Sequence, residues 1–292
     1  MENNAEVTTN IINTINTIFE NLFSSIDSNL YNVLDDIVFI NKDILNDKYF
    51  SKLFGTSTAN GILLIANSLL IGVLLYYSAK YIFSNFTYEK IENPFQFIFK
   101  CMFFGIFMNC SFFIIEQILD LNNVICSLIK GIGEDLWGKN ICFEGLIIEI
   151  NENLSVNKNN LDIFTLDGLI KGTLTISLLN LVFSYSLRYV LIKLFILLSP
   201  FAFLSLILNN TSHFFKSWYR SLFSLLFIQF IVSIVLLLLF SMDYSKENLI
   251  NKFIYIGGIY ALIRANSIVR ELFGGISTTI QTGISNLKSF SK

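Results

Sequence analysis

Charge is scarce in this sequence: only 14% of its 292 residues are Asp, Glu, Lys or Arg. A typical soluble domain carries roughly 25%. Hydrophobic residues make up 53% of the chain, and the mean hydropathy is +0.61. So few polar groups cannot cover the apolar surface of a soluble fold. We therefore predict an all-α, polytopic helical membrane protein.

Histidine and clustered basic residues are scarce as well. A single histidine, His213, excludes zinc sites built on a histidine pair. The sequence also lacks a nucleophile elbow, a phosphate-binding loop and paired intramembrane aspartates, so we expect no enzymatic activity, metal or cofactor. The net charge of −2 and the lack of basic runs give no sign of a nucleic-acid-binding tail. The start MENNAEVTTN lacks the basic region and apolar core of a signal peptide, so we expect the N-terminus to be retained.

The chain has only four cysteines, which fall into two pairs. Cys101 and Cys110 lie in an apolar run, where inert packing is expected. Cys126 and Cys142 bracket a polar segment that the predicted topology places outside the cell. A disulfide there is one alternative, and free thiols are the other.

Long apolar runs are what the sequence has in place of charge. A helix rises ~1.5 Å per residue, so about 20 apolar residues cross the ~30 Å hydrocarbon core. Five segments are predicted to span the membrane, at 59–79, 95–119, 169–190, 217–241 and 252–272. The apolar run continues beyond residue 190, so we predict a further cytoplasmic-side helix at 194–212. This helix kinks at Pro200 and either dips back into the membrane or makes a sixth full span, which the distribution of basic residues disfavours.

The remaining segments complete the predicted organisation. Residues 1–58 form an extracytoplasmic amphipathic segment, because apolar residues recur every three or four positions from Ile11 to Ile37. This helix either folds onto its own bundle or contacts a second subunit. The other units are two transmembrane helices in 59–119, an extracytoplasmic loop at 120–168, three transmembrane helices in 169–272 and a cytoplasmic tail at 273–292.

Basic residues predict the orientation of the chain. With five spans, one side of the membrane receives Lys80, Lys90, Arg188, Lys193, Lys216, Arg220, Arg270, Lys288 and Lys292. The acidic N-terminal segment and the 120–168 loop fall on the other side. Because basic residues gather in the cytoplasm, we predict an extracytoplasmic N-terminus and a cytoplasmic C-terminus in the cell membrane.

The last predicted span contains charges that need an explanation. Only eleven uncharged residues separate Lys252 from Arg264, or ~16 Å of helix, so the helix must continue past the arginine. A lipid-facing arginine there costs ~2.5–3.5 kcal/mol, so we expect Arg264 to face other helices. The segment either pins the helix or forms a conduit lining or docking face. Candidate channel-lining or subunit-contact residues are Arg264, Asn266, Arg270, Glu271, Gly274 and Gly275.

Residues 199–222 combine a proline with aromatic and basic side chains. They form either a belt at the membrane interface or a docking face for a partner. The candidate residues are Pro200, Phe215, Lys216, Trp218 and Arg220.

Two stretches, SPFAFLSLILNNTSHFFKSWYRSLFSLLFIQ and GGIYALIRANSIVRELFGGISTTIQTG, resemble the TrbL family. This family is the VirB-type polytopic inner-membrane subunit of type IV secretion systems, here in the form found in Gram-positive conjugative elements. The resemblance covers about the last hundred residues and includes the candidate residues named above, except Lys216. The N-terminal third and the 120–168 loop carry no family signature.

The resemblance implies a non-enzymatic channel or scaffold subunit. Such a subunit forms homo-oligomers beside cytosolic ATPases and helps to move a DNA–protein substrate across the cytoplasmic membrane. The alternative is a stand-alone small-solute permease or channel. Its binding site would draw on Glu116, Gln229 and Arg264.

Overall fold

The structure is a computed structural model that describes residues 13–18, 21, 33–55, 61–87, 92–146, 148, 166–241 and 249–273. These residues form helices and turns and no strand, which confirms the predicted all-α class. Four helical segments in this part of the chain are long and apolar enough to cross a membrane: Ile62–Ser84, Ser111–Trp137, Gly168–Leu197 and Ser212–Phe240. The predicted total of five spans is not confirmed.

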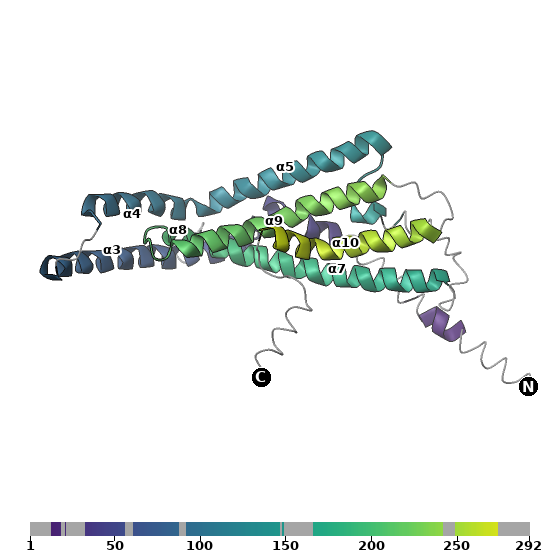
Figure 1. Cartoon of the computed structure of the whole chain (residues 1–292), viewed down its shortest axis with the longest axis horizontal. Helices are drawn as coiled ribbons and strands as arrows, with labels where there is room; N and C mark the ends of the chain where they lie inside the picture. Colours follow the sequence, from purple (N-terminus) through teal and green to yellow (C-terminus); the bar gives the residue numbers. More distant parts are fainter. Residues whose placement is uncertain are drawn as a thin grey trace, which may run out of the picture.

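Three helices form a bundle along the long axis of the molecule (Figure 1). They are α7 (Leu166–Leu197), α9 (Ser212–Phe240) and α10 (Leu249–Phe273). A fourth helix, α5 (Ser111–Trp137), packs on α9. The core between these helices is mostly aliphatic and includes Leu119, Leu181, Ile192, Val232, Leu236, Leu262 and Val269.

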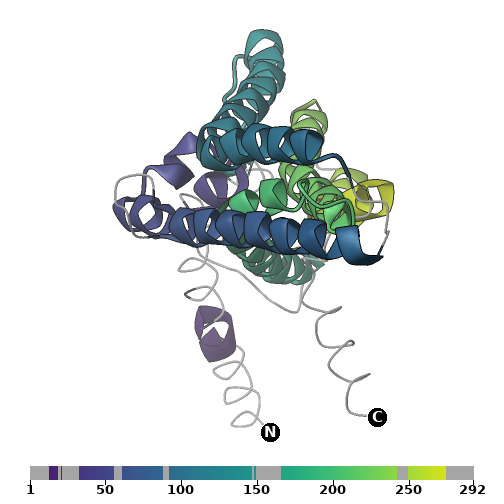
Figure 2. The same cartoon turned by 90° about the vertical axis from the view of Figure 1, so that its left-hand side faces the viewer.

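A helical hairpin lies at one end of this bundle. It consists of α3 (Ile62–Thr87) and α4 (Pro94–Asn109), and Asn93 caps α4 by accepting a hydrogen bond from the Phe95 amide. The short helix α8 (Ser199–Leu204), with Pro200 in its first turn, connects the hairpin to the bundle. Viewed from that end, α3 and α4 pass in front of the bundle (Figure 2).

The predicted second span and the predicted 120–168 loop both need correction. The helix expected at 95–119 breaks at Cys110, where the Ser111 hydroxyl donates to the Met108 carbonyl and competes with regular helix hydrogen bonds. Beyond this break α5 continues to Trp137, through eighteen residues assigned to the loop. It ends at Gly138, whose φ of 63° is readily adopted only by glycine.

The N-terminal segment explains why α5 can be helical where its sequence is polar. This segment comprises a helical turn at 33–38, η1 (Lys42–Leu45) and α2 (Lys48–Phe54). Lys42 forms an ion pair with Asp120 of α5 (3.2 Å), and the ammonium of Lys130 lies 3.2 Å from the centre of the Phe39 ring. Asp120 and Lys130 of α5 therefore face the N-terminal segment and are part of a helix instead of a loop.

The structure also decides between the two interpretations of the N-terminal helix where it is described. Leu34 and Val38 are fully buried in the core of the same chain, which favours folding onto its own bundle. The apolar positions predicted between Ile11 and Ile37 include Val33 and are one residue out of phase here, because Val33 is 45% exposed and Leu34 is buried. Most of the predicted helix lies outside the described residues.

Two neighbouring glycines in α10 differ in their surroundings. A Cβ atom at Gly258 would overlap the Leu239 side chain of α9, so this glycine allows close packing of α9 and α10. A Cβ atom at Gly257 would meet nothing within 4 Å. All four cysteines are free, so the alternative of a Cys126–Cys142 disulfide is not realised.

Candidate functional site

The most unusual polar group is Arg188, in the C-terminal half of α7. Its side chain is fully buried (0% exposed) in an otherwise apolar core. The guanidinium donates hydrogen bonds to the carbonyl of Leu225 in α9 (2.7 Å) and the carbonyl of Val38 in the N-terminal segment (2.9 Å). A longer contact of 3.5 Å reaches Oε1 of Gln229. Arg188 thus connects three separate parts of the chain.

No carboxylate among the described residues pairs with Arg188. Backbone and amide oxygens take the place of an anion. Val38 is the last residue of the helical turn at 33–38, and the carbonyls at a helix C-terminus carry partial negative charge. The ring of Tyr185 adds a cation–π contact at 5.8 Å. These dipoles stabilise the positive charge of Arg188. Because one of them is the Val38 carbonyl, the stabilisation requires the N-terminal segment to stay in contact with Arg188.

Further polar side chains extend this buried polar centre. Asn122 of α5 donates to the same Gln229 oxygen (3.1 Å), and the Tyr185 hydroxyl donates to the Leu262 carbonyl of α10 (3.1 Å). Asn266 of α10 donates to the Ser184 hydroxyl of α7 (2.6 Å). The polar centre therefore joins α5, α7, α9, α10 and the N-terminal segment.

Two atoms of the polar centre are buried without a hydrogen-bond partner among the described residues. They are Nε2 of Gln229 and Oδ1 of Asn266. Such orphaned groups are uncommon in native cores, and each costs about 1–3 kcal/mol. They are the two points at which the centre has spare hydrogen-bonding capacity.

Asp35 is a half-buried charge of the N-terminal segment, outside the membrane-spanning helices. Its carboxylate accepts hydrogen bonds from the amides of Phe143 (3.1 Å) and Glu144 (3.3 Å). Burial raises the pKa of Asp35 above its usual value, and the two amides and Lys130 partly oppose that shift. Asp35 anchors the residues that follow α5 to the N-terminal segment.

The predicted charge network of the last helix is divided between two faces. Arg264 is exposed and donates to the hydroxyl of Tyr260 (3.0 Å), and Glu271 is exposed and accepts from Ser267 (3.4 Å). Asn266 alone is buried, at 4% exposure. Arg264 therefore does not face other helices of its own protomer. The Arg270 side chain, Gly274 and Gly275 lie outside the described residues.

The candidates at 199–222 also separate into buried and exposed groups. Pro200 and Trp218 are buried, and the Trp218 indole donates to the Phe195 carbonyl (2.8 Å). Neither can act as an interface residue, because α7, α8 and α9 pack around them. Phe215 is half-buried, and Lys216 and Arg220 are exposed.

The exposed residues of α9 form a groove with the end of α10, which we call the basic groove. It has a volume of about 700 Å³ and is lined by Phe215, Lys216, Tyr219, Arg220, Phe223, Leu272 and Phe273. The rings of Phe223 and Phe273 meet edge to face with their centres 5.4 Å apart. Residues from the two stretches quoted above, distant in sequence, thus line one groove.

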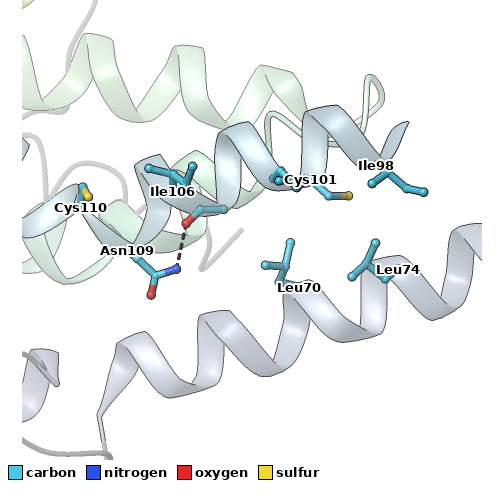
Figure 3. Close-up of a pocket in the computed structure, with 9 residues that line it drawn as sticks. Leu70, Leu74, Ile98, Cys101, Ile106, Asn109 and Cys110 are labelled. Atoms are coloured by element: carbon cyan, nitrogen blue, oxygen red, sulfur yellow. Dashed lines mark hydrogen bonds between the residues drawn. The ribbon is translucent and has the colours of Figure 1, made fainter. Parts of the chain in front are cut away.

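A second pocket lies between α3 and α4 (Figure 3). Its volume is about 500 Å³, and its lining is almost entirely apolar, including Leu70, Leu74, Ile98, Cys101, Met102 and Ile106. Asn109 is the main polar group at the pocket. Its amide donates to the Gly105 carbonyl (2.8 Å), and it exchanges hydrogen bonds with Asn67 of α3 (3.1 and 3.2 Å).

Sequence reasoning did not select Arg188 or Asn122 as site residues. The signal for Arg188 was present, because the residues from Gly172 to Ile192 contain no other charge. An ionisable residue isolated in such a run is a functional candidate by default. Asn122 had no comparable signal, because it lies in a segment interpreted as a loop.

No protein-family model matches the chain, and neither a curated protein nor a solved structure matches it. Within the described residues, no group of three or more His, Cys, Asp or Glu side chains could hold a metal ion. The site is thus defined by its own geometry: a buried cation solvated by dipoles, and a basic groove on the surface.

Proposed function

We propose that this protein is a non-enzymatic channel or scaffold subunit of a conjugative type IV secretion system. In this proposal it forms homo-oligomers in the cell membrane, beside cytosolic ATPases. It helps to move a DNA–protein substrate across that membrane. The C-terminus is cytoplasmic in this proposal. The predicted extracytoplasmic position of the N-terminal segment does not agree with its contacts to Arg188 and Lys193, which the same prediction places on the cytoplasmic side.

The observation that carries the proposal is the meeting of the two TrbL-like stretches at the basic groove. Residues 215–223 and residues 272–273 line this groove together. A chance resemblance in two separate stretches would not require them to form a common surface. Four apolar helices of spanning length, with mean hydropathies from 1.4 to 2.9, support the membrane location.

The direct test is conjugation. Deletion of the gene from its mobile element should abolish transfer, and a copy supplied in trans should restore it, as measured by counting transconjugants. Transfer that continues undiminished in the deletion strain would refute the proposal. Copurification of a coupling ATPase with the tagged full-length chain would locate the subunit within the machine.

The permease alternative has less support from the geometry. Its three polar candidates lie apart: Gln229 is buried and bonded to Arg188 and Asn122, whereas Arg264 is exposed and bonded to Tyr260. Glu116 is half-buried on α5. No hydrogen bond or ion pair joins any two of these described side chains. Solute flux into liposomes containing the protein alone would favour the alternative.

A further inference from the structure

The basic groove carries positive charge without a matching anion. Lys216 and Arg220 are one helical turn apart on α9, and both are exposed. Neither forms an ion pair with any residue that the structure describes. Glu271 is close in sequence to the groove residue Leu272, but it is not part of the lining and accepts a hydrogen bond from Ser267.

The start of α9 supplies no anion to balance these cations. The helix begins at Ser212 and has no acidic residue in its first turn. Lys216 and Arg220 lie one and two turns further along the same helix. The groove is therefore electrostatically suited to an anion.

The length of α9 indicates the depth of the groove in the membrane. Residues Ser221–Phe240 contain no charge, and at ~1.5 Å per residue they match the ~30 Å hydrocarbon core. Arg220 then lies at the boundary of the hydrocarbon, and Lys216 lies ~6 Å further out. Both side chains are at the level of phospholipid headgroups.

The walls of the groove fit the rest of a lipid molecule. Phe215, Tyr219 and Phe223 stack along one face of α9, with successive ring centres 6.4 and 6.1 Å apart. Leu272 and Phe273 form the opposite, apolar wall. An acyl chain can lie against this apolar surface while its headgroup meets the two cations.

We propose that the basic groove binds an anionic phospholipid, with Lys216 and Arg220 contacting the headgroup phosphate and the aromatic wall contacting an acyl chain. Arg220 can donate two parallel hydrogen bonds to phosphate oxygens, and Lys216 adds a compact charge. Basic pockets between membrane helices are a recurrent way of holding such lipids. This inference does not depend on a role in secretion.

The test uses the full-length chain, purified in a neutral detergent and titrated with lipid in native mass spectrometry. Phosphatidylglycerol and phosphatidylcholine with identical acyl chains are compared. We expect the wild-type protein to prefer phosphatidylglycerol. The double variant K216Q/R220Q should bind it about tenfold more weakly or worse, because each basic residue contributes roughly a fivefold gain in affinity.

Two further variants separate specific binding from general charge. K216R/R220K retains both charges and should retain the preference. K48Q/K52Q removes an exposed lysine pair with the same spacing on α2, outside the basic groove, and should leave binding unchanged. Thermal unfolding checks that all variants are folded.

Three results would overturn the inference. One is a wild-type protein that shows no preference between the two lipids. Another is an equal loss of phosphatidylglycerol binding in K216Q/R220Q and K48Q/K52Q. The third is displacement of the lipid by an equal concentration of inorganic phosphate, which would indicate a site for a soluble anion.

Discussion

The α3–α4 hairpin and the bundle of α7, α9 and α10 are both apolar, but they bury this surface to different extents. In the most apolar stretch of α3 only 6% of the residues are buried within the protomer, against 56% in the corresponding stretch of α9. Helix α9 has α5, α7 and α10 around it, whereas α3 packs mainly on α4 and α8. The bundle is therefore stabilised by its own side chains, and the hairpin depends on lipid or on another subunit.

The two regions also use polar groups differently. In the bundle, Arg188 is fully enclosed and its hydrogen bonds connect distant segments. In the hairpin, the exposed Asn109 exchanges hydrogen bonds with the half-buried Asn67. A buried group leaves unsatisfied partners when it is removed, whereas a partly exposed one does not. Substitutions should therefore have larger effects in the bundle.

The largest effect is expected for Arg188→Ala. The change opens a cavity and leaves the Val38 and Leu225 carbonyls without their donor, so we expect a loss of about 2–4 kcal/mol in unfolding free energy. Denaturant titration in detergent measures it, and amide hydrogen exchange should accelerate at 33–55. Arg264→Ala, a control at an exposed arginine, should cost less than about 0.5 kcal/mol. Similar losses in both variants would remove the distinction between buried and exposed charge.

The next effect concerns the contact between α9 and α10. Gly258→Ala forces the new methyl group against Leu239, and we expect a destabilisation of about 1–3 kcal/mol. Gly257→Ala has open space around it and should be neutral or stabilising by up to about 1 kcal/mol, because alanine favours helix. Thermal unfolding in detergent measures both. If the two variants have the same midpoint, α10 does not pack as closely on α9 as described.

A smaller effect is expected in the hairpin. The coupling between Asn67 and Asn109 can be measured with Asn67→Leu, Asn109→Leu and the double variant in a thermodynamic cycle. We expect a coupling energy of about 0.6 kcal/mol for each of the two hydrogen bonds, as is typical within membranes. A coupling energy larger than the loss of unfolding free energy in Arg188→Ala would contradict the expectation that polar contacts matter more in the bundle than in the hairpin.

The smallest effect is a pH dependence from Asp35. Burial raises its pKa in the folded state above the usual 3.8, so the folded protein holds the proton more tightly than the unfolded chain. Stability should then fall as the pH rises above 3.8 and through the raised pKa. Asp35→Asn keeps an oxygen acceptor for the Phe143 amide and should flatten this dependence. Unfolding midpoints measured across that pH range check the sign, and a rise in stability would contradict it.

Local sequence was sufficient to predict some helices but not others. The helices predicted at 217–241 and 252–272 correspond closely to α9 (Ser212–Phe240) and α10 (Leu249–Phe273), but of the two only α9 is apolar enough to count as a membrane span. In both, the helical signal lies within the segment. Helix α5 was missed beyond residue 119 because Asp120 and Lys130 contact Lys42 and Phe39, which are about 80–90 positions away. Such pairing is not visible in a local pattern.

The same reason separates the two arginines. Arg264 and Arg188 both interrupt apolar sequence, and the cost of exposing either to lipid is similar. Only the tertiary arrangement shows that Arg188 is enclosed and that Arg264 remains on the surface. For Trp218, the expected interface position was wrong because α8 folds back over the start of α9.

The hydrogen bond from Arg188 to Val38 joins residues that are 150 positions apart, and this has a consequence for biosynthesis. A ribosome adding about 5–20 residues per second needs roughly 8–30 s to travel from one to the other. During this interval the N-terminal segment and its contacts on α5 have been made, but Arg188 has not. The segment must therefore stay available in a loosely attached form until α7 is inserted, so final assembly of the protomer is a late event.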